Sequence, residues 1–176
     1  MNTMDTINVT GAGDGEHWLV GGDVTTIKAS SQDTSGDLLV LDITVSPGGG
    51  PPVLHRHGYS AVFLFQEGEF EVSTADGDHA LSTVRVAAGD TVAIPSMAWH
   101  TFKNVGPTPG RFIAVHSPAV MEDFVREVGR RIEDSSNPPK SEGPPSDEEQ
   151  RKMMEIIHKY MEVLPPEETM GEGTRR

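Results

Sequence analysis

Apolar and polar residues alternate over short segments along most of the chain. The clearest segment is 39–45, in which the odd positions are apolar and Asp42 and Thr44 face the other way, the period of a half-buried β-strand. Turn sequences such as Asp76-Gly77, typical of a hairpin, separate these segments. We therefore expect strands over 24–29, 38–45, 62–65, 70–74, 80–86, 91–94, 99–103 and 112–115. Many short strands at this spacing predict a sandwich or a barrel.

After the last expected strand, the apolar residues change to helical spacing. They recur from 120 to 128, and Gly129 is expected to end this first helix. A second helix is expected to begin at Ser146, which forms a capping box with Glu149, and to end at Pro165-Pro166. Its apolar stripe is Met153, Ile156, Ile157, Tyr160, Met161 and Leu164. We expect this stripe to pack on the barrel or at a subunit interface rather than to recognise another partner.

These patterns divide the chain into four parts. Residues 1–15 form a polar, flexible N-terminus, and residues 16–118 form the barrel. Residues 119–166 hold the two helices and a Pro-rich linker, and residues 167–176 form a tail that we expect to be frayed.

Composition narrows the classes of partner. The chain has 176 residues, enough for one domain with extensions. Its 14 basic and 27 acidic residues give a net charge of −13, which argues against a nucleic acid or an anionic membrane as partner. The absence of cysteine excludes disulfides, thiolate metal sites and cysteine nucleophiles. No apolar leader or membrane span is present in the sequence, so we expect a cytoplasmic protein that acts on a small molecule.

Three histidines are candidate metal ligands. His55 and His57 project from the same side if they lie in a strand, because side chains alternate between its faces. His100 lies in another expected strand and can complete the site. Neutral imidazole is the commonest protein ligand for first-row transition metals. The sequence therefore predicts a divalent transition-metal site, with Fe, Mn, Ni, Cu and Zn all open.

Three phenylalanines are candidates for a substrate pocket. Phe63 and Phe65 continue the face of His57, and Phe102 shares the face of His100. They either line an apolar pocket for an aromatic or polyketide-like molecule or fill the barrel as ordinary core.

Two further residues are candidates for catalysis. Tyr59 has the parity of His57, so it reaches the ion or a substrate oxygen, unless Gly58 breaks the strand and Tyr59 covers the pocket mouth. His116 lies near the end of the last barrel strand. Its imidazole is an acid or base candidate if it faces inward, and otherwise a hydrogen-bonded residue at the rim.

The order of these residues resembles the two motifs of the cupin superfamily, G-x5-H-x-H-x3/4-E-x6-G and G-x5-P-x-G-x2-H-x3-N. The matching residues are Gly49, His55, His57 and Gly68, then Gly89, Pro95, His100 and Asn104. The resemblance covers roughly residues 16–166 and extends to single-domain cupins described as quercetin 2,3-dioxygenase-like. It implies an all-β cupin double-stranded β-helix, or jelly-roll barrel, with C-terminal helices, and a homodimer formed through edge strands.

Two positions depart from the motifs. The glutamate of the first motif falls on Ala61, and a glycine of the second falls on Met97, which we expect beside the pocket. Without the carboxylate, a bound ion keeps its full positive charge and favours an anionic, bidentate oxygen ligand. The alternative is a weakened or empty site.

The resemblance implies a metal-dependent dioxygenase acting on a small aromatic or enolisable, oxygen-rich metabolite. Since the glutamate is absent, His116 or Tyr59 would have to serve as the base. Two alternatives stay open, a non-redox cyclase, isomerase or lyase in the same pocket and a non-catalytic small-molecule binder.

Overall fold

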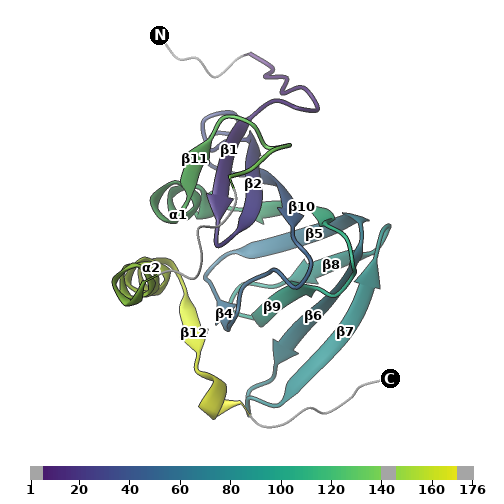
Figure 1. Cartoon of the computed structure of the whole chain (residues 1–176). Helices are drawn as coiled ribbons and strands as arrows, with labels where there is room; N and C mark the ends of the chain where they lie inside the picture. The colour runs from purple at the N-terminus through teal and green to yellow at the C-terminus, as the bar shows by residue number, and fades with distance from the viewer. Residues whose placement is uncertain (1–5, 140–145, 170–176) are drawn as a thin grey trace.

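The computed structural model describes residues 6–139 and 146–169. Its strands, in chain order, are β1 (Glu16–Val20), β2 (Asp23–Ala29), β3 (Leu39–Val45), β4 (Leu54–Arg56), β5 (Ser60–Glu67), β6 (Glu69–Ala75), β7 (Leu81–Ala87), β8 (Thr91–Ile94), β9 (Trp99–Asn104), β10 (Gly110–Ser117), β11 (Arg130–Ile132) and β12 (Glu162–Leu164). They form a seven-stranded sheet, β11-β1-β2-β3-β10-β5-β8, and a five-stranded sheet, β12-β4-β9-β6-β7. The sheets pack as a cupin-type jelly-roll barrel, and α1 and α2 lie on the same side of it (Figure 1). This confirms the expected fold class.

The core lies between the two sheets. Strand β3 buries alternate residues, as its two-residue period predicts. Phe65, Phe70 and Phe112 are each less than 2% exposed. Their ring centroids lie 4.9 to 5.7 Å apart, the spacing of well-packed aromatic pairs. This aromatic cluster is part of the hydrophobic core.

Asn104, at the end of β9, forms side-chain hydrogen bonds with the backbone at three positions. It is fully buried, and its Nδ2 donates to the carbonyls of Val45 at 2.9 Å and Thr108 at 2.8 Å. Its Oδ1 accepts from the backbone N–H of Gly106 at 2.9 Å. A buried amide with all these partners stabilises the loop that connects β9 to β10.

We expect Asn104→Ala to lower the free energy of unfolding by about 2–4 kcal/mol, because it leaves buried backbone groups without partners. Urea denaturation followed by circular dichroism measures the change. Lys103→Ala, at the neighbouring exposed position, is the matched control and is expected to shift stability by less than about 0.5 kcal/mol. Equal midpoints for the two variants would contradict the assigned role of Asn104.

The two helices begin where the sequence indicates. Helix α1 (Met121–Val128) ends at Gly129, whose N–H bonds to the carbonyl of Val125. Helix α2 (Asp147–Tyr160) begins with the expected capping box between Ser146 and Glu149. None of the helices within the two described ranges is long and apolar enough to cross a membrane.

The predicted end of the second helix is wrong. Helix α2 stops at Tyr160, and the chain then forms β12 before the prolines, which open a short 3-10 turn (Pro166–Glu168). The reason is tertiary, because β12 pairs with β4 and buries Leu164 against Leu54 and Trp99. Parts of the expected linker and terminal segments, namely 1–5, 140–145 and 170–176, lie outside the described residues.

Candidate metal centre and cavity

The three predicted ligand histidines converge inside the barrel. His55 lies on β4 and is directly opposite His100 on β9, and His57 follows β4 by one residue. All three are buried, and their candidate ligand nitrogens lie within 4.8 Å of one another. The histidine trio therefore forms a compact group that can hold one metal ion.

Each ring of the trio has its tautomer set by the backbone. The Nδ1 atoms lie 2.9 to 3.3 Å from main-chain oxygens of residues two positions away along the chain. The acceptors are the carbonyls of Val53, Tyr59 and Ala98. Because a carbonyl only accepts, Nδ1 carries the proton and leaves the Nε2 lone pair for an ion. Histidines that bind a metal usually donate their other ring N–H to a carbonyl or a carboxylate in this way. The three histidines therefore fit a divalent transition metal.

Burial also keeps the trio neutral. It lowers the pKa of His55 to about 3, with a further lowering from the nearby His100 ring. The same two causes lower the pKa of His57 to about 4, and burial lowers the pKa of His100. Neutral imidazole is the form that binds metal, so no proton must leave the site at neutral pH before an ion enters.

The structure places an alanine and a fourth histidine beside the trio. Ala61 on β5 is 2% exposed and lies directly opposite His116 on β10. The cluster found among the described residues contains the three histidines and no carboxylate. A first coordination shell built from these side chains is therefore neutral.

His116 differs from the three ligand candidates in its hydrogen bonding. It is 4% exposed, and its buried Nδ1 has no hydrogen-bond partner among the described residues. Its ring centroid is 6.3 Å from that of His57, and it lines the same cavity. Burial lowers its pKa to about 3. A neutral imidazole with a free nitrogen can exchange a proton or hydrogen bond with a bound molecule.

Tyr59 packs behind His57. The two rings stack at 3.7 Å with an interplanar angle of 5°. The Tyr59 hydroxyl donates to the sulfur of Met121 on α1 at 2.8 Å, and burial raises its pKa. Tyr59 thus orients His57 through its ring and its carbonyl, while its phenol stays protonated.

A cavity of about 180 Å³ extends from the trio between the sheets to the helices. Its apolar walls include Leu41, Phe63, Phe102, Met121, Phe124 and Ile157. Of the five expected pocket residues, Phe63 and Phe102 line this cavity. Ala61 and Phe65 are buried in the adjoining core.

Met97 lies in the turn before β9 and is 43% exposed. Its φ of 65° is a backbone conformation that favours glycine, which accounts for the glycine that the second motif has at this position. The Met97 N–H donates to the carbonyl of His57 at 2.8 Å. The contribution of Met97 to the site is therefore a backbone tether on His57.

Asp23 is a cavity residue that sequence reasoning missed. It begins β2 and lines the cavity, where its carboxylate accepts hydrogen bonds from the backbone of Ser46 and Gly50. Burial raises its pKa to about 6. The sequence gives little indication that Asp23 lines a cavity, because an aspartate that follows Gly21-Gly22 is typical of a turn.

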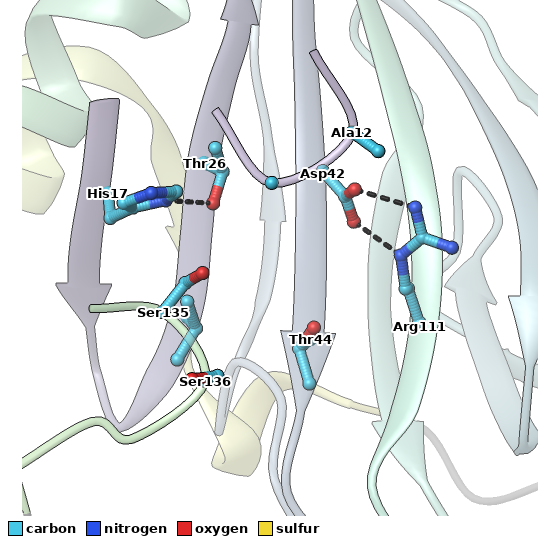
Figure 2. Close-up of a pocket in the computed structure, with 10 residues that line it drawn as sticks. Ala12, His17, Thr26, Asp42, Thr44, Arg111, Ser135 and Ser136 are labelled. Atoms are coloured by element: carbon cyan, nitrogen blue, oxygen red, sulfur yellow. Dashed lines mark hydrogen bonds and ion pairs between the residues drawn. The ribbon is translucent and has the colours of Figure 1, made fainter. Parts of the chain in front are cut away.

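A second, polar hollow of about 220 Å³ lies on the seven-stranded sheet (Figure 2). Arg111 donates to both carboxylate oxygens of Asp42 at 2.7 and 2.8 Å. His17 Nδ1 lies 2.8 Å from Thr26 Oγ1. The charged side chains of this polar hollow, Arg111 and Asp42, thus pair with each other. The histidine cavity instead contains His116, whose Nδ1 has no partner among the described residues. The histidine cavity is therefore the candidate functional site.

The cupin-domain family model matches residues 41–116, a span that contains all three ligand candidates. No curated protein matches the chain at a significant level. An RmlC-like cupin from Shewanella frigidimarina is 26% identical and covers 70% of this chain and 100% of its own, with a TM-score of 0.55.

More distant structures show the same fold. A predicted oxalate decarboxylase from Thermotoga maritima is 21% identical and covers 59% of this chain and 92% of its own, with a TM-score of 0.51. The oxalate decarboxylase of Lactobacillus farciminis, in its formate complex, is 19% identical with a TM-score of 0.55. That match covers 65% of this chain and 34% of the enzyme, so the chain spans about a third of its length.

Proposed function

We propose that this chain is a metal-dependent cupin enzyme, a quercetinase-like dioxygenase that acts on a small aromatic or enolisable, oxygen-rich metabolite. One observation carries the proposal. Three neutral imidazoles, each with its tautomer fixed by a carbonyl, meet beside an apolar cavity.

The histidine trio would hold a divalent Fe, Mn, Ni, Cu or Zn ion. Such an ion acts as a Lewis acid, and all of these metals except zinc also supply redox chemistry. Because the three ligands are neutral, they leave the positive charge of the ion uncompensated. The site therefore favours a substrate that binds as an enolate or a phenolate.

His116 is the base in this proposal. It lines the cavity as a neutral imidazole with an unpaired Nδ1, so it can accept a hydrogen bond from a substrate hydroxyl or enol. Because burial lowers the pKa of His116, it would take up the proton only from a group made more acidic by binding at the histidine trio. Tyr59 orients His57 and does not transfer the proton, since burial raises its pKa. Phe63 and Phe102 hold the body of the substrate and exclude water from it.

The lining favours this substrate class over oxalate, after which the neighbouring decarboxylases are named. Among the described cavity residues there is no lysine or arginine. A small dicarboxylate could pair one carboxylate with an ion held by the trio, but its second carboxylate would face mostly apolar walls. An aromatic or enolisable molecule buries its carbon skeleton against those walls.

The test begins with elemental analysis of protein prepared without an affinity tag. The metal-loaded protein is then incubated with single-ring catechols and with β-diketones, which match a cavity of about 180 Å³, with and without oxygen. The dioxygenase proposal requires oxygen consumption that depends on both metal and substrate. A metal-loaded protein that consumes no oxygen with any of them would contradict it.

His116→Gln is expected to lower kcat about 100-fold, the usual contribution of a positioned general base, while metal content stays unchanged. His158→Ala, on the exposed face of α2, is the matched control and should retain full activity. Loss of metal in His116→Gln would instead make His116 a ligand. Unchanged kcat would remove it from the mechanism.

A non-redox isomerase, cyclase or lyase is the second candidate. His116 favours it, because an unpaired imidazole can move protons without any oxidant. Turnover of the same compounds without oxygen would identify this activity. Binding without turnover under either condition would indicate a small-molecule binder.

A further inference from the structure

The polar groups of the cavity are arranged asymmetrically. His55, His57, His100 and His116 lie close together, whereas the other polar side chains that line the cavity, Asp23 and Thr25, lie on β2. The register of β3 separates them. His116 is opposite Leu39 at one end of β3, whereas Val24, next to Asp23, is opposite Thr44 near the other end. Apolar side chains, including Phe63 and Phe102, line the cavity along with these polar groups.

The Asp23 carboxylate is held in place without charge compensation. Backbone N–H groups of Ser46 and Gly50 donate to it. None of the ion pairs formed between described residues involves Asp23. A fixed negative charge beside low-dielectric walls repels another anion more strongly than it would in water. A ligand hydroxyl or ammonium group would instead donate a charge-assisted hydrogen bond to it.

The cavity size limits the ligand. Its volume of about 180 Å³ is close to the roughly 150 Å³ of an engineered apolar cavity that binds benzene. It is smaller than the roughly 300–1000 Å³ pockets that hold drug-sized ligands. A molecule with one ring, or a β-diketone of similar size, therefore matches the volume of the cavity that the histidines and Asp23 both line.

We propose that Asp23 is a specificity-determining residue for single-ring ligands. It selects ligands whose end remote from the histidine trio is neutral or donates a hydrogen bond. It rejects ligands that carry a second anionic group at that end. The inference rests on the proposed function, because the first anionic group of the ligand is taken to bind an ion held by the trio. It adds the charge pattern of the substrate to that function.

The experiment uses the full chain loaded with zinc, which is redox-inert and so leaves catechols intact. Isothermal titration at pH 8, where Asp23 is ionised, compares 4-methylcatechol with 3,4-dihydroxybenzoate. These probes differ only in a methyl or carboxylate group at the remote position. We expect 4-methylcatechol to bind at least about tenfold more tightly. In Asp23→Asn, which keeps an acceptor for the loop, the difference should shrink to about twofold.

Asp78→Asn is the matched control, since it removes the same charge from an exposed turn and should leave the tenfold difference intact. A second measurement needs no variant. The wild-type chain should bind 3,4-dihydroxybenzylamine more tightly than 3,4-dihydroxybenzoate.

Each result decides the inference. Equal binding of the three probes by the zinc-loaded wild-type protein, or an unchanged preference in Asp23→Asn, would overturn the role of Asp23 and leave the metal site standing. Failure of the chain to take up zinc would overturn the proposed function, and the inference with it.

Discussion

His100→Ala will release the metal ion and leave the barrel folded. His100 supplies one of three candidate ligands and lies directly opposite His55 in the sheet. Loss of an outer hydrogen bond to a ligand alone costs about 10–100-fold in metal affinity, so loss of a ligand should cost on the order of 1000-fold. The aromatic core around Phe65, Phe70 and Phe112 is not touched by the change. Metal analysis after dialysis against a weak chelator, together with circular dichroism, measures both effects.

His158→Ala is the control for His100→Ala, because it removes a histidine from the exposed face of α2. It should retain the metal content of the wild-type protein. If His100→Ala also retained that content, the ligand assignment would be wrong.

The metal-free protein will lose most of its stability between pH 7 and pH 5. Burial lowers the pKa of His55 and His116 to about 3 and that of His57 to about 4, whereas unfolded histidines titrate near 6.5. Between these values the unfolded chain binds more protons, so the free energy of unfolding falls as the pH falls. At pH 5 the loss is about 2 kcal/mol per histidine, or roughly 6 kcal/mol for three. Protonation of Asp23, whose pKa burial raises to about 6, offsets about 1 kcal/mol of that loss. The remaining loss is comparable with the whole stability of many domains, about 5–15 kcal/mol.

Urea denaturation in the presence of a chelator, at pH 7 and at pH 5, tests this expectation. His116→Gln should lose about 2 kcal/mol less than the wild-type protein over the same interval. His158→Ala should behave as the wild-type protein does. If the free energy of unfolding were the same at both pH values, the expectation would be wrong. The buried histidines would then take up protons in the folded protein as readily as in the unfolded chain.

The strands and the ligand trio were predictable because their signals are local. The alternation in 39–45 is a property of neighbouring residues, and the structure buries those same odd positions. The capping box of Ser146 is likewise complete within one helical turn. His55 and His57 needed only strand parity to be placed together, and His100 needed only a strand of its own.

The remaining features depend on contacts between distant segments. The end of α2 is set by the pairing of β12 with β4, more than a hundred positions apart, and no local pattern reports it. The helix residues Met121 and Ile157 line the cavity, whereas their spacing indicated only that they would dock. Tyr59 shares the parity of His57, but its ring stacks on that histidine because the chain bends after β4. Asp23 acquires its place only when the 46–50 loop folds over it.

The pairing of β12 with β4 also has a consequence for biosynthesis. Strand β9 meets β4 at the pair His55–His100, whereas β12 runs beside all three residues of β4, with Val163 opposite His55. While a ribosome is still translating the preceding helix, the edge of the histidine-bearing strand has no neighbour. A chain that lacks residues 162–164 would therefore leave one edge of the histidine-bearing strand without its hydrogen-bonded neighbour.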